Sequence, residues 1–169
     1  EYVIAMIGNL RAGLVVVNVN PLYTARELEA QLQDSGASVL VMMENFASTY
    51  QQIKTPSSIA QVIVSSPGEL LGLKGHVINW VARHIKKMIP HWELPHIRFK
   101  KALKIGSGRT FVRPQTNLDD IAFLQYTGGT TGVSKGAVLL HRNILSNVMQ
   151  IESWLNPGLK NKPDQQLVF

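Results

Sequence analysis

Glycine, threonine and lysine are concentrated between Tyr126 and Gly136, in the order Tyr-Thr-Gly-Gly-Thr-Thr-Gly-Val-Ser-Lys-Gly. Glycine allows a backbone to approach a ligand closely and to point several N–H groups into one concavity. Threonine hydroxyls add hydrogen-bond donors or Mg²⁺ ligands, and a lysine supplies a positive charge. This combination predicts a loop that binds phosphate groups.

The candidate phosphate-binding residues of this loop are Thr127, Gly128, Gly129, Thr130, Thr131, Gly132 and Lys135. Thr130 is also the candidate to meet a Mg²⁺ ion carried by the phosphates. The alternative is a glycine-rich surface turn in which the threonines bond only to nearby backbone groups. Three threonines and a lysine in one short loop favour phosphate binding.

Two common phosphate-binding motifs do not fit this segment. In a P-loop, Gly-Lys-Ser/Thr ends the motif and a helix follows, but here Val133 and Ser134 separate Gly132 from Lys135, and a glycine comes next. The dinucleotide motif Gly-x-Gly-x-x-Gly also fails, because the glycine spacing differs and no helix is predicted after it. The loop therefore belongs to neither class.

The loop is expected to connect two strands. The apolar run Ile121–Leu124 precedes it and Ala137–Leu140 follows it, and both have the length and composition of buried strands. Asn117–Asp120 is expected to turn the chain into the first strand. Beyond the second strand, Asn143 is expected to cap a helix over residues 144–154.

Together with His141-Arg142-Asn143, this segment resembles the phosphate loop of the adenylate-forming superfamily of acyl- and aryl-CoA synthetases, adenylation domains and luciferases. The usual form is Tyr-Thr-Ser-Gly-Thr-Thr-Gly-x-Pro-Lys-Gly, from which Gly128 and Ser134 depart. The Gly-Gly version is similar to that of bacterial long-chain fatty-acid–CoA ligases. Further stretches similar to their N-terminal domain are Leu10-Arg11-Ala12-Gly13, Asn18-Val19-Asn20-Pro21-Leu22-Tyr23-Thr24 and Asp34-Ser35-Gly36-Ala37.

The resemblance implies an α/β fold with parallel-sheet layers, and it implies ATP, CoA, a long-chain fatty acid and Mg²⁺ as substrates and cofactor. The loop would close over the β- and γ-phosphates of ATP while a carboxylate attacks the α-phosphate, and CoA would later displace AMP. The family's other motifs and its small C-terminal domain with the catalytic lysine are not found before Phe169. Residues 1–169 are therefore expected to be an incomplete N-terminal domain, with the C-terminal domain absent, no catalytic residue and no activity alone.

The composition is that of a globular domain, with 169 residues of which 45% are hydrophobic. No apolar run reaches the length of a membrane-spanning helix, which is about 20 residues. Cysteine is absent, which favours a cytoplasmic protein. With a fatty-acid substrate, a peripheral place on the inner membrane is also expected. The sequence leaves the oligomeric state open, with a homodimer as one candidate.

Before the loop, short apolar runs alternate with helical patterns. Helices are expected at 2–10, 24–33 and 45–53, a buried strand at 14–17, and further short strands at 39–42 and 62–64. Thr24 and Glu27 form a capping-box signature at the start of the second helix, and Gly36 is expected to end it. Alternation of this kind is typical of a parallel sheet with right-handed crossovers.

The net charge of +6 comes from residues 69–109, where Glu69 and Glu93 are the only acidic residues. This segment is expected to be a basic insertion in the domain. Within it, apolar residues gather on one helical side and basic residues on the other, which predicts a basic amphipathic helix that ends near Pro90. Residues 92–115 are expected to be mostly irregular.

The predicted amphipathic helix has two interpretations. Its apolar side could pack against its own domain, or the helix could bind an anionic membrane surface through Trp80, Arg83, Lys86 and Lys87. The pattern alone favours packing, and a fatty-acid substrate favours the membrane. A nucleic-acid role is disfavoured, because Trp80 and Trp92 lie on the apolar side rather than beside the basic residues.

Two other functions are compatible with the sequence. Another adenylate-forming enzyme, such as a shorter-chain acyl-CoA synthetase or an adenylation domain, would carry a similar loop. A non-catalytic module that binds a membrane surface would be built around residues 70–92. The Gly-Gly loop and the basic helix favour a long-chain fatty-acid–CoA ligase.

Overall fold

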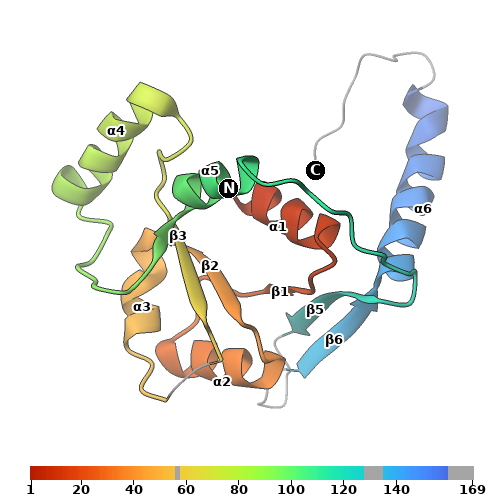
Figure 1. Ribbon diagram of the computed structural model, residues 1–169, viewed down its shortest axis with the longest axis horizontal. Helices are drawn as coiled ribbons and strands as arrows, with labels where there is room; N and C mark the ends of the chain where they lie inside the picture. Colours follow the sequence, from red (N-terminus) through yellow and green to blue (C-terminus); the bar gives the residue numbers. More distant parts are fainter. Residues whose placement is uncertain (56–57, 128–134, 160–169) are drawn as a thin grey trace.

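The computed structural model describes residues 1–55, 58–127 and 135–159, and within them the strands form two three-stranded sheets (Figure 1). The first sheet has the order β1-β5-β6, with strands Val16–Asn18, Ile121–Thr127 and Lys135–Leu140. The second has the order β2-β3-β4, with strands Val39–Met43, Gln61–Ser65 and Ile97–Arg98. Apart from the antiparallel β5–β6 pair, the strands pair in parallel, as the alternating pattern predicted.

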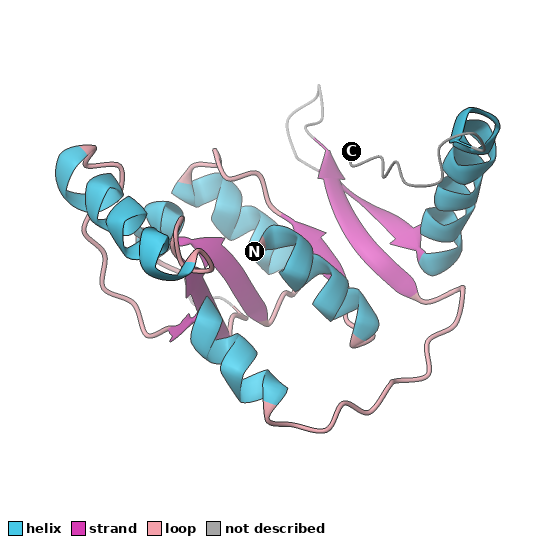
Figure 2. Cartoon of the chain, turned by 90° about the horizontal axis from the view of Figure 1, so that it is seen from above, coloured by secondary structure: helices cyan, strands magenta, loops and turns pink. Residues whose placement is uncertain are grey.

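Helices surround these sheets, and α4 and α6 lie at opposite ends of the molecule (Figures 1 and 2). The helices are α1 (Tyr2–Arg11), α2 (Ala25–Ser35), α3 (Ala47–Gln51), α4 (Gly72–Trp80), α5 (Phe99–Ser107) and α6 (His141–Leu159). A 3₁₀ turn at Glu44–Phe46 precedes α3, and a π-helical turn at Val81–Ile85 continues α4.

The start and end of α2 follow from its local sequence. The N–H of Thr24 donates to Glu27 Oε2 at 2.8 Å, and the N–H of Glu27 donates to Thr24 Oγ1 at 3.4 Å. The Thr24 N–H and the Thr24 hydroxyl, which donates to the same Oε2 at 2.7 Å, lower the pKa of the Glu27 carboxyl, and the backbone hydrogen bond has the larger effect. Gly36 follows the helix with φ of 62°, a left-handed conformation that suits glycine. The predicted capping box and C-terminal glycine are both confirmed.

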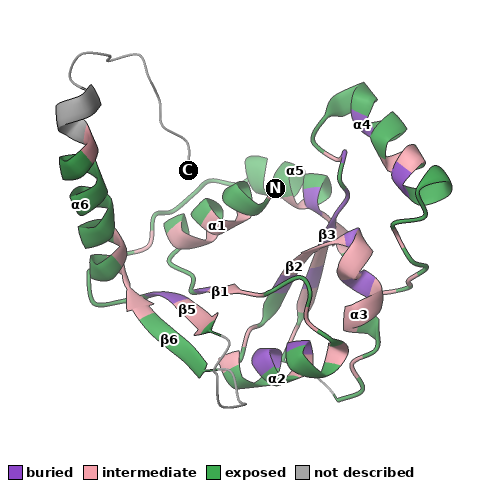
Figure 3. Ribbon diagram, turned by 180° about the vertical axis from the view of Figure 1, so that it is seen from behind, coloured by how far each residue is buried: buried purple, intermediate pink, exposed green. Residues whose placement is uncertain are grey.

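Two clusters of buried side chains hold the layers together. Val16, Ala122 and Phe123 belong to β1 and β5, and Leu28, Leu32 and Leu40 belong to α2 and β2. Figure 3 marks buried residues in purple, among them parts of α2 and β5. The expectation of a buried strand over 14–17 is wrong in part, because Leu14 and Val15 are exposed. They precede the first residue that pairs with β5, so no neighbouring strand covers them.

Residues 92–115 contain regular structure that the sequence analysis did not predict, namely β4 and α5. Phe99 at the start of α5 is buried. The N–H of Lys100 donates to Glu69 Oε1 at 2.9 Å, so a carboxylate from a distant turn satisfies the helix N-terminus. A partner that far away in the sequence gives no local start signal.

The helix after the hairpin begins earlier than predicted. α6 starts at His141, and Asn143 lies inside its first turn, where its Oδ1 accepts a hydrogen bond from the N–H of Leu140 at 2.8 Å. The helix also continues past Trp154 to Leu159. Asn143 therefore accepts a hydrogen bond from a backbone N–H at the helix start, as a cap does, although it lies inside the helix rather than before it.

The packing interpretation placed the apolar side of the basic amphipathic helix against the domain, but in the structure the opposite side faces the domain. Gly75 and Ala82 are the buried residues of α4 and its π turn. Asn79, a polar residue on the same side as Gly75, donates to Ser66 Oγ at 2.9 Å and accepts from the N–H of Gly68 at 2.8 Å. Trp80, assigned to the apolar side, is exposed.

Close backbone approach explains which side of α4 faces the domain. Gly68 and Gly75 are in direct contact, and a β-carbon on either would collide with the backbone of the other. Helical geometry also ends before Pro90: the residue after the π turn, Lys86, is followed by Lys87 with φ of 47°, outside the helical range. The polar and glycine-bearing side of α4 therefore contacts the protein.

The capping box gives a stability prediction. Thr24→Ala removes the side-chain oxygen that accepts from Glu27, and it should lower the free energy of unfolding by about 1 kcal/mol. Urea denaturation of the variant and of Thr110→Ala, an exposed threonine in a loop, would test this. Equal losses in the two variants would contradict the role assigned to Thr24.

Candidate functional site

The predicted phosphate loop lies at the end of a β-hairpin. Thr127, the last residue of β5, pairs in register with Lys135, the first residue of β6. The structure thus brings together Thr127 and Lys135, two of the predicted phosphate-binding residues, and both are exposed. The other predicted residues, Gly128, Gly129, Thr130, Thr131 and Gly132, lie outside the described residues. The prediction that the loop connects two strands is confirmed.

Tyr126 attaches the loop end of the hairpin to α2. Its hydroxyl donates to Asp34 Oδ2 at 2.5 Å. Burial, followed by the hydrogen bond to Asp34 and its charge, raises the pKa of Tyr126 to about 12. The tyrosine ring lies over Gly136, where a β-carbon would come within 3.0 Å of Tyr126 Cζ. Gly136 thus leaves the space that the ring occupies.

A chain of side-chain amides joins the same end of β5 to β1. Asn18 Nδ2 donates to Gln125 Oε1 at 3.1 Å, and Asn18 Oδ1 accepts from the hydroxyl of Tyr2 at 2.9 Å. Gln31 Nε2 from α2 donates to the carbonyl of Asn18 at 2.8 Å. Asn18 of β1 therefore contacts the strand that leads into the loop, and α1 and α2 hold Asn18.

The other end of the hairpin is held by the turn at Asn117–Asp120. The N–H of Asn117 donates to Asp120 Oδ2 at 2.7 Å, and the N–H of His141 donates to the carbonyl of Asp120 at 3.0 Å. Arg142 forms an ion pair with Asp119. The predicted turn is confirmed, and His141 contributes its backbone to it.

This arrangement provides a fixed support for a phosphate loop. Hydrogen bonds and cross-strand pairing position Thr127 and Lys135 at the two sides of the loop. Both residues are exposed, and a hydroxyl donor and a cation are groups that suit the oxygens of a polyphosphate. The described end of the hairpin therefore offers side chains of the kinds that bind phosphate and neutralise its charge.

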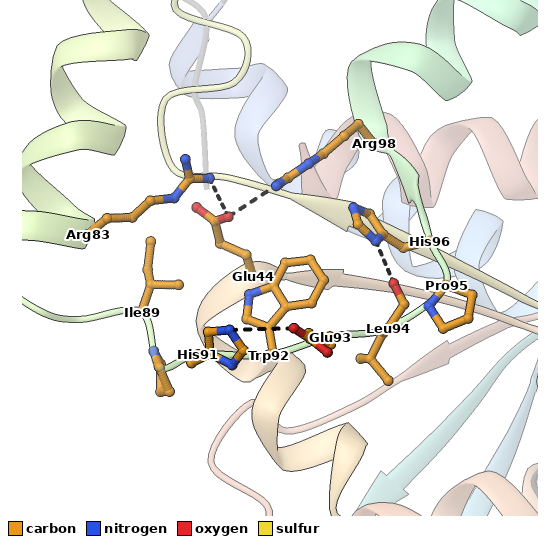
Figure 4. A pocket seen from close by; sticks show the side chains of 11 residues that line it. Glu44, Arg83, Ile89, His91, Trp92, Glu93, Leu94, Pro95, His96 and Arg98 are labelled. Carbon is orange, nitrogen blue, oxygen red and sulfur yellow. Dashed lines mark hydrogen bonds and ion pairs between the residues drawn. The ribbon is translucent and has the colours of Figure 1, made fainter.

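A separate pocket of about 830 Å³ is lined by Glu44 after β2, by residues 89–96 that lead into β4, and by Arg83 and Arg98 (Figure 4). Arg83 and Arg98 approach Glu44 from two sides, at 2.6 and 3.2 Å from Glu44 Oε2. The guanidinium of Arg98 also lies over the ring of Trp92 at 5.7 Å, and Trp92 packs against His96 with ring centroids 4.9 Å apart.

Glu44 is the side chain in this pocket that water cannot reach, with 1% of its surface exposed, whereas Arg83 and Arg98 are about 40% exposed. A buried carboxylate needs charged partners, because removing it from water is costly. The two arginines supply them from the π turn after α4 and from β4. Glu44 therefore joins three segments that are distant in the sequence.

One of the residues assigned to a membrane surface has a partner within the domain. Arg83 pairs with the buried carboxylate of Glu44 while 39% of its side chain stays exposed, so its role at a membrane stays a prediction. Trp80, Lys86 and Lys87 are exposed, so their role at a membrane stays a prediction. Among the described residues, no helix combines the length and hydropathy needed to cross a bilayer.

Glu44 and Arg98 were missed by sequence reasoning. The sequence did contain one indication of Glu44, because this residue directly follows an apolar strand. The carboxyl ends of parallel strands meet at one edge of a sheet, where functional residues gather. No comparable signal marked Arg98, because the short strand β4 was not predicted.

Neutralising Glu44 should destabilise the domain. Glu44→Gln replaces two charge-assisted hydrogen bonds with weaker ones, and it should lower the free energy of unfolding by about 2 kcal/mol. Glu93→Gln is the matched control, because Glu93 is exposed and its ion pair with His91 spans 3.8 Å. Chemical denaturation would compare the variants, and a loss in the control as large as in Glu44→Gln would be inconsistent with this account.

Removing the Tyr126 hydroxyl should loosen the hairpin. Tyr126→Phe should cost about 1 kcal/mol at neutral pH, whereas Tyr23→Phe, with no hydroxyl hydrogen bond among the described residues, should cost less. Because the folded pKa of about 12 exceeds the unfolded value of about 10, the contribution should be present below pH 10 and lost as pH rises from there toward 12. Denaturation across this range and a tyrosinate absorbance titration would check both.

The comparisons with known proteins agree with this fold. The AMP-binding enzyme family profile matches residues 1–168. The chain is 50% identical over 157 residues to the long-chain-fatty-acid–CoA ligase of Haemophilus influenzae, covering 92% of this chain and 28% of that protein. It is 47% identical over 170 residues to the ligase of that name from Salmonella typhimurium, covering 99% of this chain and 30% of the relative. The chain therefore spans about 30% of that relative's length.

Solved structures show the same fold. The anthranilate CoA ligase AuaEII in complex with anthranoyl-AMP matches 84% of this chain and 23% of its own chain, with a TM-score of 0.62 and 22% identity. An acyl-CoA synthetase from Brucella canis matches 90% of this chain and 23% of its own chain, with a TM-score of 0.61 and 16% identity. The predicted α/β class is thus confirmed. Because the family profile covers the chain from its first residue to Val168, this chain belongs to the AMP-binding enzyme family.

Proposed function

We propose that the full-length enzyme that carries this chain activates a long-chain fatty acid with ATP and transfers it to CoA. The observation that carries the proposal is the 50% identity to a long-chain-fatty-acid–CoA ligase across 92% of this chain. The hairpin agrees with it, since Thr127 and Lys135 lie opposite each other at the two sides of the glycine-rich loop.

The proposed reaction has two steps. A carboxylate oxygen of the fatty acid attacks the α-phosphorus of ATP, and the bond to the bridging oxygen breaks so that pyrophosphate leaves. The sulfur of CoA then attacks the acyl carbonyl, AMP leaves, and the thiol proton is released to a base or to water. Negative charge increases on the departing pyrophosphate in the first step, which is where cations and N–H donors lower the barrier.

The roles proposed for this chain are in phosphate binding. Lys135 neutralises charge on the β- and γ-phosphates, and Thr127, Thr130 and Thr131 donate hydroxyl hydrogen bonds alongside the backbone of Gly128, Gly129 and Gly132. Mg²⁺ prefers oxygen ligands, and threonine hydroxyls are among the oxygen groups that this loop contains. When bound, Mg²⁺ would neutralise phosphate charge, with Thr130 as the residue proposed to face it.

Substrate class separates this proposal from the nearest alternative, another adenylate-forming enzyme. Exchange of labelled pyrophosphate into ATP by the full-length enzyme, measured with carboxylic acids of increasing chain length, would decide between them. Exchange that is strongest with long-chain fatty acids is expected. Preference for short or aromatic acids would assign the enzyme to another member of the family.

We propose further that this enzyme is cytoplasmic and works peripherally at the inner membrane. A long-chain fatty acid partitions into bilayers because each buried methylene contributes about 0.8 kcal/mol, whereas ATP and CoA are dissolved in the cytoplasm. The substrates therefore meet at the membrane surface. A homodimer stays a prediction, which sedimentation of the full-length enzyme would test.

Removing the charge and one hydroxyl of the loop should impair the first step. Lys135→Ala combined with Thr130→Ala in the full-length enzyme should reduce acyl-adenylate formation by about 100-fold or more, because charge on the leaving pyrophosphate would be less stabilised. Pyrophosphate exchange measures this step without CoA transfer.

The matched control is Lys101→Ala combined with Thr110→Ala, which removes the same side-chain types at exposed positions in and after α5. The control should retain wild-type exchange, and both variants should keep the wild-type thermal midpoint. Wild-type exchange in the loop variant would mean that the phosphate site lies elsewhere.

A further inference from the structure

Helix α4 turns its apolar side away from the domain. Leu73, Val77 and Trp80 are 88%, 63% and 56% exposed, and they recur at the spacing of one helical side. Figure 3 shows the outer side of this helix as mainly exposed residues. Ile85 and Met88 extend the exposed apolar side chains past the helix end.

The inner contacts fix this orientation. The close contact between Gly68 and Gly75 and the two hydrogen bonds of Asn79 occupy the side that faces the 66–71 turn. Arg83, one turn later, is paired with the buried carboxylate of Glu44. Rotating α4 to bury Trp80 would break these contacts and leave Glu44 without one of its two cations.

The charge around this apolar side is positive. The sequence contains no acidic residue between Glu69 and Glu93. Lys74, Lys86 and Lys87 are all exposed in this interval. Lysines beside an apolar stripe can extend their ammonium groups to anionic headgroups while the apolar side chains enter the acyl boundary, and tryptophan is favoured at that depth.

The outer sides of α1 and α6 lack this charge. The outer side of α6 includes Val148, Met149 and Trp154, but Glu152 lies beside them and no lysine falls between residues 141 and 155. On α1 the exposed Val3, Ile4 and Ile7 follow Glu1. Helix α5 does carry lysines without an acidic residue, but its apolar Leu103 and Ile105 are only 39% and 44% exposed. Of the two described helices with this charge, α4 therefore presents the more exposed apolar side.

We propose that the outer side of α4, comprising Leu73, Val77, Trp80, Ile85 and Met88 with Lys74, Lys86 and Lys87, docks on an anionic lipid bilayer. The proposal rests on the peripheral membrane location proposed above and names the surface responsible for it. The helix lies in the plane of the membrane surface, with Arg83 and Asn79 directed toward the protein. Docking in this way brings the enzyme to the phase in which its fatty-acid substrate is most concentrated.

The test uses the full-length enzyme and sedimentation with vesicles made of equal amounts of phosphatidylcholine and phosphatidylglycerol. Leu73→Glu combined with Val77→Glu places two carboxylates on the docking side and should weaken vesicle binding by about tenfold or more. The matched control is Leu22→Glu combined with Val112→Glu, because these residues are 83% and 82% exposed and lie outside α4. The control should bind vesicles as the wild type does.

Separate outcomes identify which proposal fails. Absence of wild-type binding to the anionic vesicles would overturn the membrane location itself. Wild-type binding that the α4 variant retains would overturn the docking surface and leave the location intact. A lower thermal midpoint for the α4 variant than for the control, measured without vesicles, would show that another part of the enzyme covers this side, and it would also overturn the proposal.

Lysine charge provides a second measurement. Lys86→Glu combined with Lys87→Glu should weaken binding to the mixed vesicles, because these side chains would then repel phosphatidylglycerol. Added salt should weaken wild-type binding for the same reason. Binding that is unaffected by both changes would contradict the assignment of an anionic partner.

Discussion

One buried carboxylate determines how several segments of this chain are arranged. Glu44 follows β2 directly and is withdrawn from water, so it requires cationic partners. Arg83 and Arg98 meet that requirement from the turn after α4 and from β4. The pairing places both segments at the carboxyl edge of the second sheet. Together with the contact between Gly68 and Gly75, it holds the side of α4 that contacts the domain, so the side chains on the opposite side are exposed.

The β5–β6 hairpin is also held by contacts with distant segments, but these are strand pairing and hydrogen bonds rather than ion pairs. β5 pairs with β1 on one side and with β6 on the other, so its direction is fixed along its length. Tyr126 and Gln125 add side-chain hydrogen bonds to α2 and β1 at the end where the loop begins. A loop that must hold a flexible polyphosphate benefits from ends that do not move, because less conformational entropy is then lost on binding. The family to which the chain belongs is consistent with such a use.

Features with local causes could be predicted from the sequence. The capping box of Thr24 and Glu27, the glycine after α2 and the strands on both sides of the loop each depend on residues close together in the chain. Features with distant causes could not. Asp34 and Tyr126 are far apart in sequence, Glu69 supplies the N-terminal contact of α5 from another turn, and the periodicity of α4 shows two sides without showing which one faces inward.

The orientation of α4 depends on the lack of a β-carbon at Gly68 and Gly75, because only glycine lets the two backbones come this close. Hydrophobicity normally decides which side of a helix is inside, but here two missing β-carbons permit an approach that larger residues would prevent. The hydropathy pattern of this helix suggests that its apolar side packs inward. The close glycine contact instead places the polar side inward and leaves the apolar side exposed. Helices of this inverted kind will be misassigned by hydropathy and can be recognised by glycines on the polar side.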